Sequence, residues 1–108
     1  MLSPVTLIRA TGLTNRVGYA YAATGDPSAR LVLTAAACPL DRTGTVVRPG
    51  DHAGQARQVM ANLTAALAAA GAHLGDVVKT TVYVASSQRA DLVTTWDVVT
   101  AASAGGER

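Results

Sequence analysis

The stretch from residue 69 to residue 84 reads Ala-Ala-Gly-Ala-His-Leu-Gly-Asp-Val-Val-Lys-Thr-Thr-Val-Tyr-Val. Its glycine at position 71 predicts the end of a helix, because glycine adopts the left-handed C-terminal conformation without steric cost. The β-branched and aromatic residues of 77–84 predict a strand. The sequence therefore predicts a junction at which the chain passes from helix to strand within a few residues.

A long helix is predicted before the junction, from Asp51 to about Ala70. Asp51 is a suitable N-cap, since its carboxylate accepts hydrogen bonds from the first free amides of a helix. Apolar side chains recur at helical spacing, and small alanine side chains on this face permit close approach to a sheet. The apolar positions are Val59, Met60, Leu63, Ala66, Leu67 and Ala70.

The N-terminal half carries strand patterns separated by turns. Residues 5–10 and 18–23 alternate as strands do, and Gly-Asp-Pro-Ser at 25–28 predicts a turn between strands. Residues 31–37 form a nearly continuous apolar run, which is typical of a buried central strand. Residues 45–47 follow another turn and predict a short hairpin arm.

A second helix is predicted near the end of the sequence. Ser86 or Ser87 caps it, and Leu92, Trp96 and Val99 recur at the spacing of one helical face, with Trp96 as a core anchor. We therefore predict a single α+β domain, residues 1–108, in which two helices cover one face of a mixed sheet.

Composition favours a globular protein that associates with copies of itself. The 108 residues are 49% hydrophobic and 15% charged, with one Trp and no Phe. A core of alanine, valine and leucine packs thinly, and a chain this short buries only about two-thirds of its unfolded surface. We therefore expect the chain to bury one of its faces against another subunit.

Charge and cysteine content exclude several classes of function. The net charge is +2, and the basic residues are scattered singly, so nucleic acid is an improbable partner. The single Cys38 excludes an internal disulfide and indicates a reducing compartment; we expect it to be a small buried hydrophobe.

No signal peptide or membrane span is recognisable, which predicts a cytoplasmic protein without membrane partners. His52 and His73 lack metal-ligand spacing, so no metal is expected.

Three stretches resemble the signature of the RidA (YjgF-type, reactive intermediate deaminase) family. They are Cys-Pro-Leu-Asp-Arg-Thr-Gly at 38–44, Gln-Ala-Arg-Gln-Val-Met-Ala-Asn-Leu at 55–63, and the opening stretch at 69–84. The resemblance covers about residues 15–107, with matching spacings between the blocks.

The resemblance implies a chorismate-mutase-like fold assembled as a homotrimer, with clefts between neighbouring subunits. It also implies hydrolysis of reactive enamines and imines, such as 2-aminoacrylate or 2-iminobutanoate, to 2-keto acids and ammonia. No cofactor and no metal is needed for this reaction.

Several residues correspond to the family's cleft, so substrate binding is predicted for them. Tyr19 or Tyr21 resembles the tyrosine that lines the cleft. Ala35 and Ala36 stand where the family has Ser-Gly, which removes a hydroxyl. Arg89 lies at the cleft edge and offers a guanidinium to a substrate carboxylate.

The family's Pro-Pro-x-Arg-Ser segment, which carries its catalytic arginine, is absent from the 108 residues, as are a late glutamate and the final strands. Arg108 resembles the basic residue that precedes the two prolines. The catalytic residue therefore stays unknown, and without the last strand we expect an unpaired sheet edge. Two functions remain open: an enamine/imine deaminase, and a non-catalytic trimeric module that binds a small acid or a partner protein. Ribonuclease activity is the weakest alternative.

Overall fold

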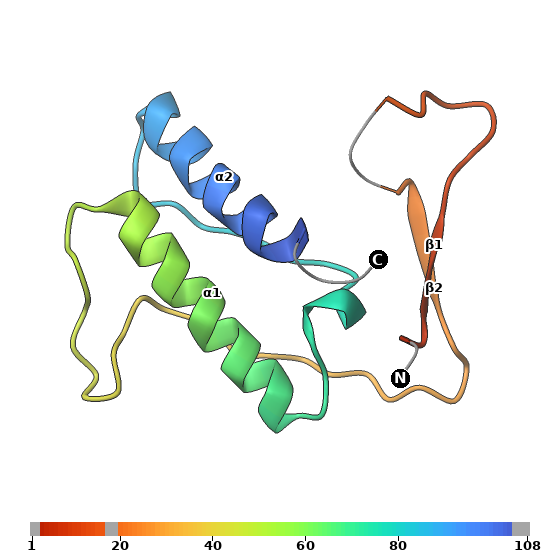
Figure 1. Ribbon diagram of the computed structural model, residues 1–108, viewed down its shortest axis with the longest axis horizontal. Helices are drawn as coiled ribbons and strands as arrows, with labels where there is room; N and C mark the ends of the chain where they lie inside the picture. Colours follow the sequence, from red (N-terminus) through yellow and green to blue (C-terminus); the bar gives the residue numbers. More distant parts are fainter. Residues whose placement is uncertain (1–2, 17–19, 105–108) are drawn as a thin grey trace.

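The computed structural model describes residues 3–16 and 20–104. Its elements follow the order of strand β1 (Val5–Ile8), strand β2 (Ala22–Gly25), helix α1 (His52–Ala69), the short 3-10 helix η1 (Leu74–Asp76) and helix α2 (Arg89–Ala104). Figure 1 shows the two strands as a separate ribbon on one side and the two helices packed side by side on the other.

The two strands form an antiparallel pair, with Val5 opposite Gly25 and Ile8 opposite Ala22. The predicted strand at 5–10 is therefore confirmed in its first part. Of the strand predicted at 18–23, residues 18 and 19 lie outside the described residues, and β2 overlaps the prediction at 22 and 23. The turn after β2 also forms as predicted, since the carboxylate of Asp26 accepts hydrogen bonds from the amide and the hydroxyl of Ser28.

Helix α1 has the predicted ends. The Asp51 carboxylate caps it by accepting a hydrogen bond of 2.9 Å from the amide of Gly54, and Arg48 holds that carboxylate through an ion pair of 2.8 Å. At the other end, Gly71 has a φ of +80°, the left-handed conformation that terminates helices. The start and stop signals in the sequence are thus confirmed.

The core lies between α1 and α2. Ala56, Met60 and Leu67 of α1 are buried against α2, which contributes Thr95 and Val99. The expectation that Trp96 anchors this core is wrong, because the residue is 60% exposed. The core is small, and no described large side chain is completely buried.

The segments 31–37 and 77–84 were predicted as strands but have no ladder partner among the described residues. The first is also not buried: Leu31 and Leu33 are 81% and 86% exposed, against 37% for Val32. This alternation of exposed and less exposed side chains indicates that the backbone of segment 31–37 is extended as in a strand. The segment lacks only a neighbouring strand with which to form backbone hydrogen bonds. The predicted arm at 45–47 is likewise reduced to one isolated bridge, between Leu40 and Val46.

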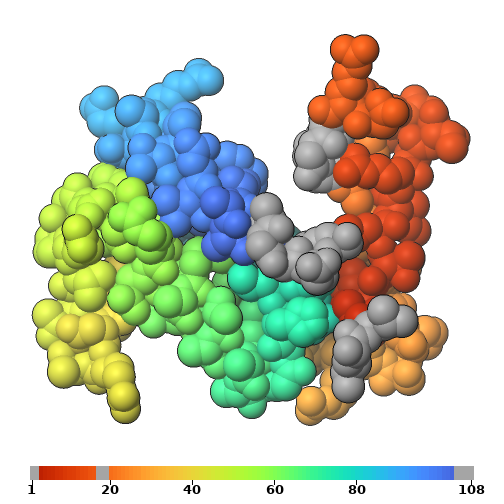
Figure 2. Space-filling view, viewed as in Figure 1, coloured from red at the N-terminus to blue at the C-terminus, as the bar shows by residue number. Residues whose placement is uncertain are grey.

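The α+β class is confirmed, with two helices and a sheet that is smaller than expected. The radius of gyration is 15.4 Å, whereas a compact domain of this length has about 13 Å. Figure 2 shows the reason, a wide hollow between the strand pair and the helices.

No helix in the described part of the chain is long and apolar enough to cross a membrane.

Candidate functional site

The turn at residues 38–47 is held together by Asp41. One oxygen of this carboxylate accepts hydrogen bonds from the hydroxyl of Thr43 (2.7 Å), the amide of Thr43 (2.9 Å) and the amide of Thr45 (3.0 Å). The hydroxyl of Thr43 foremost, and then the two amides, hold the pKa of Asp41 below its ordinary value. One oxygen of the carboxylate therefore holds the turn together.

Polar side chains of α1 fix this turn against the helix. The amide of Asn62 donates to the carbonyls of Cys38 and Leu40, both at 2.9 Å. Gln58 donates to the Asn62 oxygen at 2.9 Å and so orients the amide, while Gln55 donates to the carbonyl of Val47. The polar residues of the blocks at 38–44 and 55–63 thus form a structural frame that sets the end of segment 31–37.

Of the two predicted tyrosines, Tyr19 lies outside the described residues. Tyr21 directly precedes β2 and is half-buried. Its hydroxyl donates a hydrogen bond of 2.8 Å to the carbonyl of Thr14, and its amide donates to the carbonyl of Ile8. These bonds fix the ring beside the loop that follows β1.

Ala35 and Ala36 are exposed on segment 31–37 and present only methyl groups. Cys38, just beyond them, is exposed too, so the expectation that it is buried is wrong. Arg89 is the exposed first residue of α2. Figure 1 places the start of α2 and the strand pair, which Tyr21 adjoins in the sequence, at opposite sides of the molecule. A single chain therefore does not gather the predicted site residues in one cleft.

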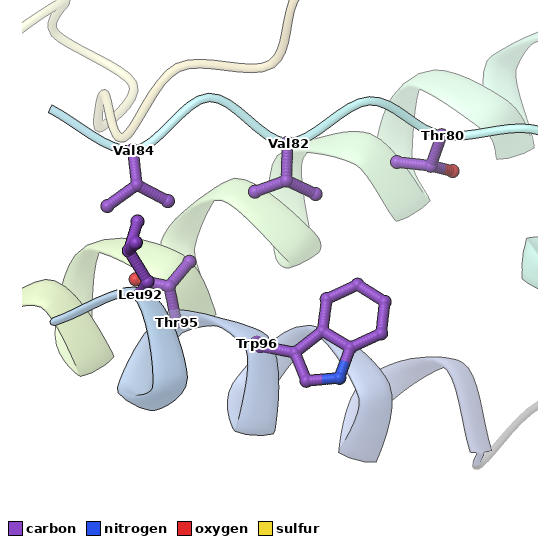
Figure 3. Close-up of a pocket in the computed structure, with 6 residues that line it drawn as sticks. All are labelled: Thr80, Val82, Val84, Leu92, Thr95 and Trp96. Carbon is purple, nitrogen blue, oxygen red and sulfur yellow. The ribbon is translucent and has the colours of Figure 1, made fainter. Parts of the chain in front are cut away.

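An apolar hollow does form between segment 77–84 and α2. Figure 3 shows three side chains of the extended segment facing three of the helix across a cavity of about 310 Å³. The lining residues are Thr80, Val82, Val84, Leu92, Thr95 and Trp96. The sequence contained a signal for this hollow, because alternate residues of segment 77–84 and α2 residues about one helical turn apart are mostly apolar. It gave no indication that the space between them would remain open.

A polar cluster lies at the start of α2. Ser86 donates a hydrogen bond of 2.7 Å to Asp91 and accepts one from the amide of Gln88. The helix begins only at Arg89, so Ser86 stands before its first turn and accepts from none of the amides of α2 as a cap would. The other oxygen of Asp91 lies 3.6 Å from the imidazole of His52 on α1. This contact joins the two helices. Within residues 3–16 and 20–104, no cluster of three or more metal-ligating side chains occurs.

The α+β architecture is consistent with a protein of the RidA class, and sequence comparison identifies the family. The profile of the Endoribonuclease L-PSP family matches residues 14–105. The chain belongs to this family, that of the RidA or YjgF-type proteins, which confirms the resemblance of its three signature stretches.

The curated relatives share one function in their names. The 2-iminobutanoate/2-iminopropanoate deaminases of Escherichia coli strain K12, Shigella flexneri and Salmonella typhimurium strain LT2 are each 46% identical over 55 residues. The alignment covers 50% of this chain and 41% of each relative, so it spans less than half the length of those enzymes. No solved structure matches significantly.

Proposed function

We propose that this chain forms an enamine/imine deaminase of the RidA type, which hydrolyses substrates such as 2-iminobutanoate or 2-aminoacrylate to 2-keto acids and ammonia in the cytoplasm. The family match over residues 14–105 carries the proposal, and the names of the relatives supply the reaction. Water adds to the carbon of the C=N bond, and cleavage of the C–N bond then releases ammonia and leaves a carbonyl group. The reaction requires neither a metal nor a cofactor.

In this proposal, the active site of the deaminase lies between the subunits of a homotrimer. The separation of Tyr21 from Arg89 within one chain supports this arrangement, because a neighbouring copy can bring a second α2 to the strand pair of the first. The exposed side chains of Leu31, Leu33 and Tyr83 also support it, since isolated soluble chains rarely expose such apolar surface.

Arg89 is the proposed anchor for the substrate carboxylate. It is exposed, lies at the first turn of α2, and carries a guanidinium that pairs with carboxylates through two parallel hydrogen bonds. Such an anchor would hold the imine carbon in place for attack by water. Tyr19 or Tyr21, together with Ala35 and Ala36, would line the same cleft.

The test is the rate of ammonia and keto-acid release from 2-iminobutanoate generated in place. We expect acceleration over buffer, and we expect Arg89→Ala to raise KM at least tenfold, the effect of about 1.4 kcal/mol of lost binding. Arg42→Ala is the matched control, because Arg42 is also exposed but belongs to the turn at 38–47. No acceleration by the purified protein would overturn the proposal, and equal effects of the two substitutions would remove Arg89 from the site.

A non-catalytic trimeric module that binds a small acid is the second candidate. The methyl groups of Ala35 and Ala36 favour it, because they stand where the family pattern has a hydroxyl and they are exposed on segment 31–37. Thermal-shift measurements with 2-keto acids and amino acids distinguish the two functions. A rise in melting temperature without turnover would select the binding module, and no rise with any acid would exclude it.

A further inference from the structure

One hydroxyl group closes the segment of chain that carries Arg89. The hydroxyl of Ser86 accepts a hydrogen bond of 3.0 Å from the amide of Gln88 and donates one of 2.7 Å to the carboxylate of Asp91. Arg89, the first residue of α2, lies within the stretch that these two bonds enclose. Residues 86–91 therefore form a closed local structure at the start of the helix.

Asp91 ties this structure to the neighbouring helix. Its second carboxylate oxygen lies 3.6 Å from the Nδ1 atom of His52, the first residue of α1. The side chains of His52 and Asp91 are only 27% and 34% exposed, so water screens this contact less than it screens a fully exposed pair. Figure 1 shows that α1 and α2 begin at the same side of the molecule. The first turn of α2 is therefore held against α1 by a side chain close to Arg89 in the sequence.

A fixed backbone at Arg89 matters because the guanidinium ends a long, flexible side chain. A helix start that nothing holds frays, and its residues then exchange among several conformations. Two parallel hydrogen bonds to a carboxylate form only when the plane of the guanidinium is aligned with that of its partner. A first turn that is held in place restricts where Arg89 can reach, and this preorganisation favours one orientation of a bound acid.

We propose that Asp91 is a positioning residue for Arg89: through Ser86 and His52 it holds the first turn of α2 where Arg89 pairs with the carboxylate of a small 2-imino or 2-keto acid. Asp91 itself does not touch the ligand. The inference rests on the proposed function, because Arg89 is the carboxylate anchor proposed there. It adds the contacts that direct this anchor, and it names anionic acids, rather than neutral imines, as the preferred ligands.

The test compares Asp91→Ala with Asp97→Ala in the full 108-residue chain, because Asp97 is an exposed aspartate on the same helix. Asp91→Ala should raise KM for 2-iminobutanoate about fivefold and leave kcat within about twofold, since the chemistry is unchanged once the acid is bound. Asp97→Ala should behave as the wild type does. A fall in kcat without a change in KM would contradict a role in positioning the anchor.

A double variant shows whether Asp91 acts through Arg89. In the Arg89→Ala background, Asp91→Ala should have no further effect on KM, because the group that it positions is gone. A merely structural role would raise KM by the same factor in both backgrounds, and that result would overturn the inference.

Ser86→Ala reaches the same contact from the other side, with Ser87→Ala as its control. Ser86 holds Asp91, whereas the neighbouring Ser87 is exposed. We expect Ser86→Ala to raise KM about threefold and Ser87→Ala to have no effect. This pair also decides the question if Asp91→Ala fails to fold, which circular dichroism reveals. Equal KM values for Ser86→Ala and Ser87→Ala would contradict the inference.

The outcomes separate this inference from the deaminase proposal. Turnover that depends on Arg89 but not on Asp91 would overturn the inference alone. Absence of turnover would overturn the deaminase, and calorimetric titration of 2-ketobutanoate, the keto acid expected from 2-iminobutanoate, then supplies the affinities. An affinity that falls about fivefold in Asp91→Ala, but no further when Asp91→Ala is added to Arg89→Ala, would support the inference. No binding, or equal affinity of the wild type and Asp91→Ala, would overturn it as well.

Discussion

The side-chain amide of Asn62 donates a hydrogen bond of 2.9 Å to the backbone carbonyl of Cys38, across 24 residues of sequence. A second bond from the same nitrogen reaches the carbonyl of Leu40. A single side chain in the middle of α1 thus fixes where segment 31–37 ends and where the turn begins. These two bonds explain why the blocks at 38–44 and 55–63 occur together at a set spacing.

Replacement of Asn62 should loosen this frame. Asn62→Ala removes the donor for two carbonyls, and we expect a loss of about 1 kcal/mol in the free energy of unfolding, measured by urea denaturation. Asn62→Asp should cost more at neutral pH, because a carboxylate cannot donate and faces two carbonyl oxygens. Arg57→Ala, on an exposed position of the same helix, is the control and should change little. A loss no larger than that of Arg57→Ala would contradict the role of Asn62.

Asp41 should make the protein less stable in acid. Its pKa in the folded chain lies below the ordinary value of about 3.9, mainly because the hydroxyl of Thr43 and the amides of the turn donate to it. The carboxylate therefore contributes stability above about pH 4, and this contribution is lost as the pH falls through the folded-state pKa. Asp41→Asn removes the titration.

Melting temperatures of the wild type and Asp41→Asn, measured between pH 7 and pH 3, test this dependence. Because both proteins share the other acidic groups, the difference between their melting temperatures isolates Asp41. We expect the wild type to be the more stable at pH 7 and the difference to shrink toward pH 3. A difference that stays constant over this range would refute the assignment.

The core between α1 and α2 should depend on Leu67. Its side chain is buried against α2, so Leu67→Ala removes apolar contacts and leaves a cavity, at a cost of about 2–3 kcal/mol. Leu31→Ala is the matched control, because that leucine is 81% exposed and should cost little in the isolated chain. Urea denaturation in dilute solution measures both values, and similar losses for the two variants would mean that the core lies elsewhere.

The helices could be predicted from sequence because their signals are local. Asp51 and Gly71 act on amides and carbonyls within one turn, so they needed no knowledge of the rest of the fold. The strand signals of 31–37 and 77–84 specified an alternating backbone correctly, but a strand becomes part of a sheet only through a partner. The predicted burial of Trp96 was wrong for the same reason, because the burial of this side chain depends on which residues pack against that side of α2.

The sequence could predict which residue types belong to the candidate site, but not where those residues lie relative to one another. Arg89 and Tyr21 were selected by resemblance, and nothing in their sequence spacing could indicate that one chain holds them apart. The donors to Asp41, in contrast, lie within four residues, and an Asp-x-Thr-Gly turn has a local explanation. Local hydrogen bonding was therefore accessible from sequence, whereas the separation of Arg89 from Tyr21 was not.

The outward face of segment 31–37 gives the last prediction, on assembly. Leu33 is 86% exposed in the single chain, and its burial between subunits would account for a large apolar side chain in that position. Leu33→Lys should leave the unfolding of the dilute monomer unchanged within about 0.5 kcal/mol, the usual range for surface substitutions. The same change should shift the population from trimer to monomer in sedimentation equilibrium, because a buried ammonium without a partner opposes association. Arg30→Lys, one residue before the segment, keeps its charge and should assemble as the wild type does. If Leu33→Lys and the wild type sediment alike, this face lies outside the subunit interface.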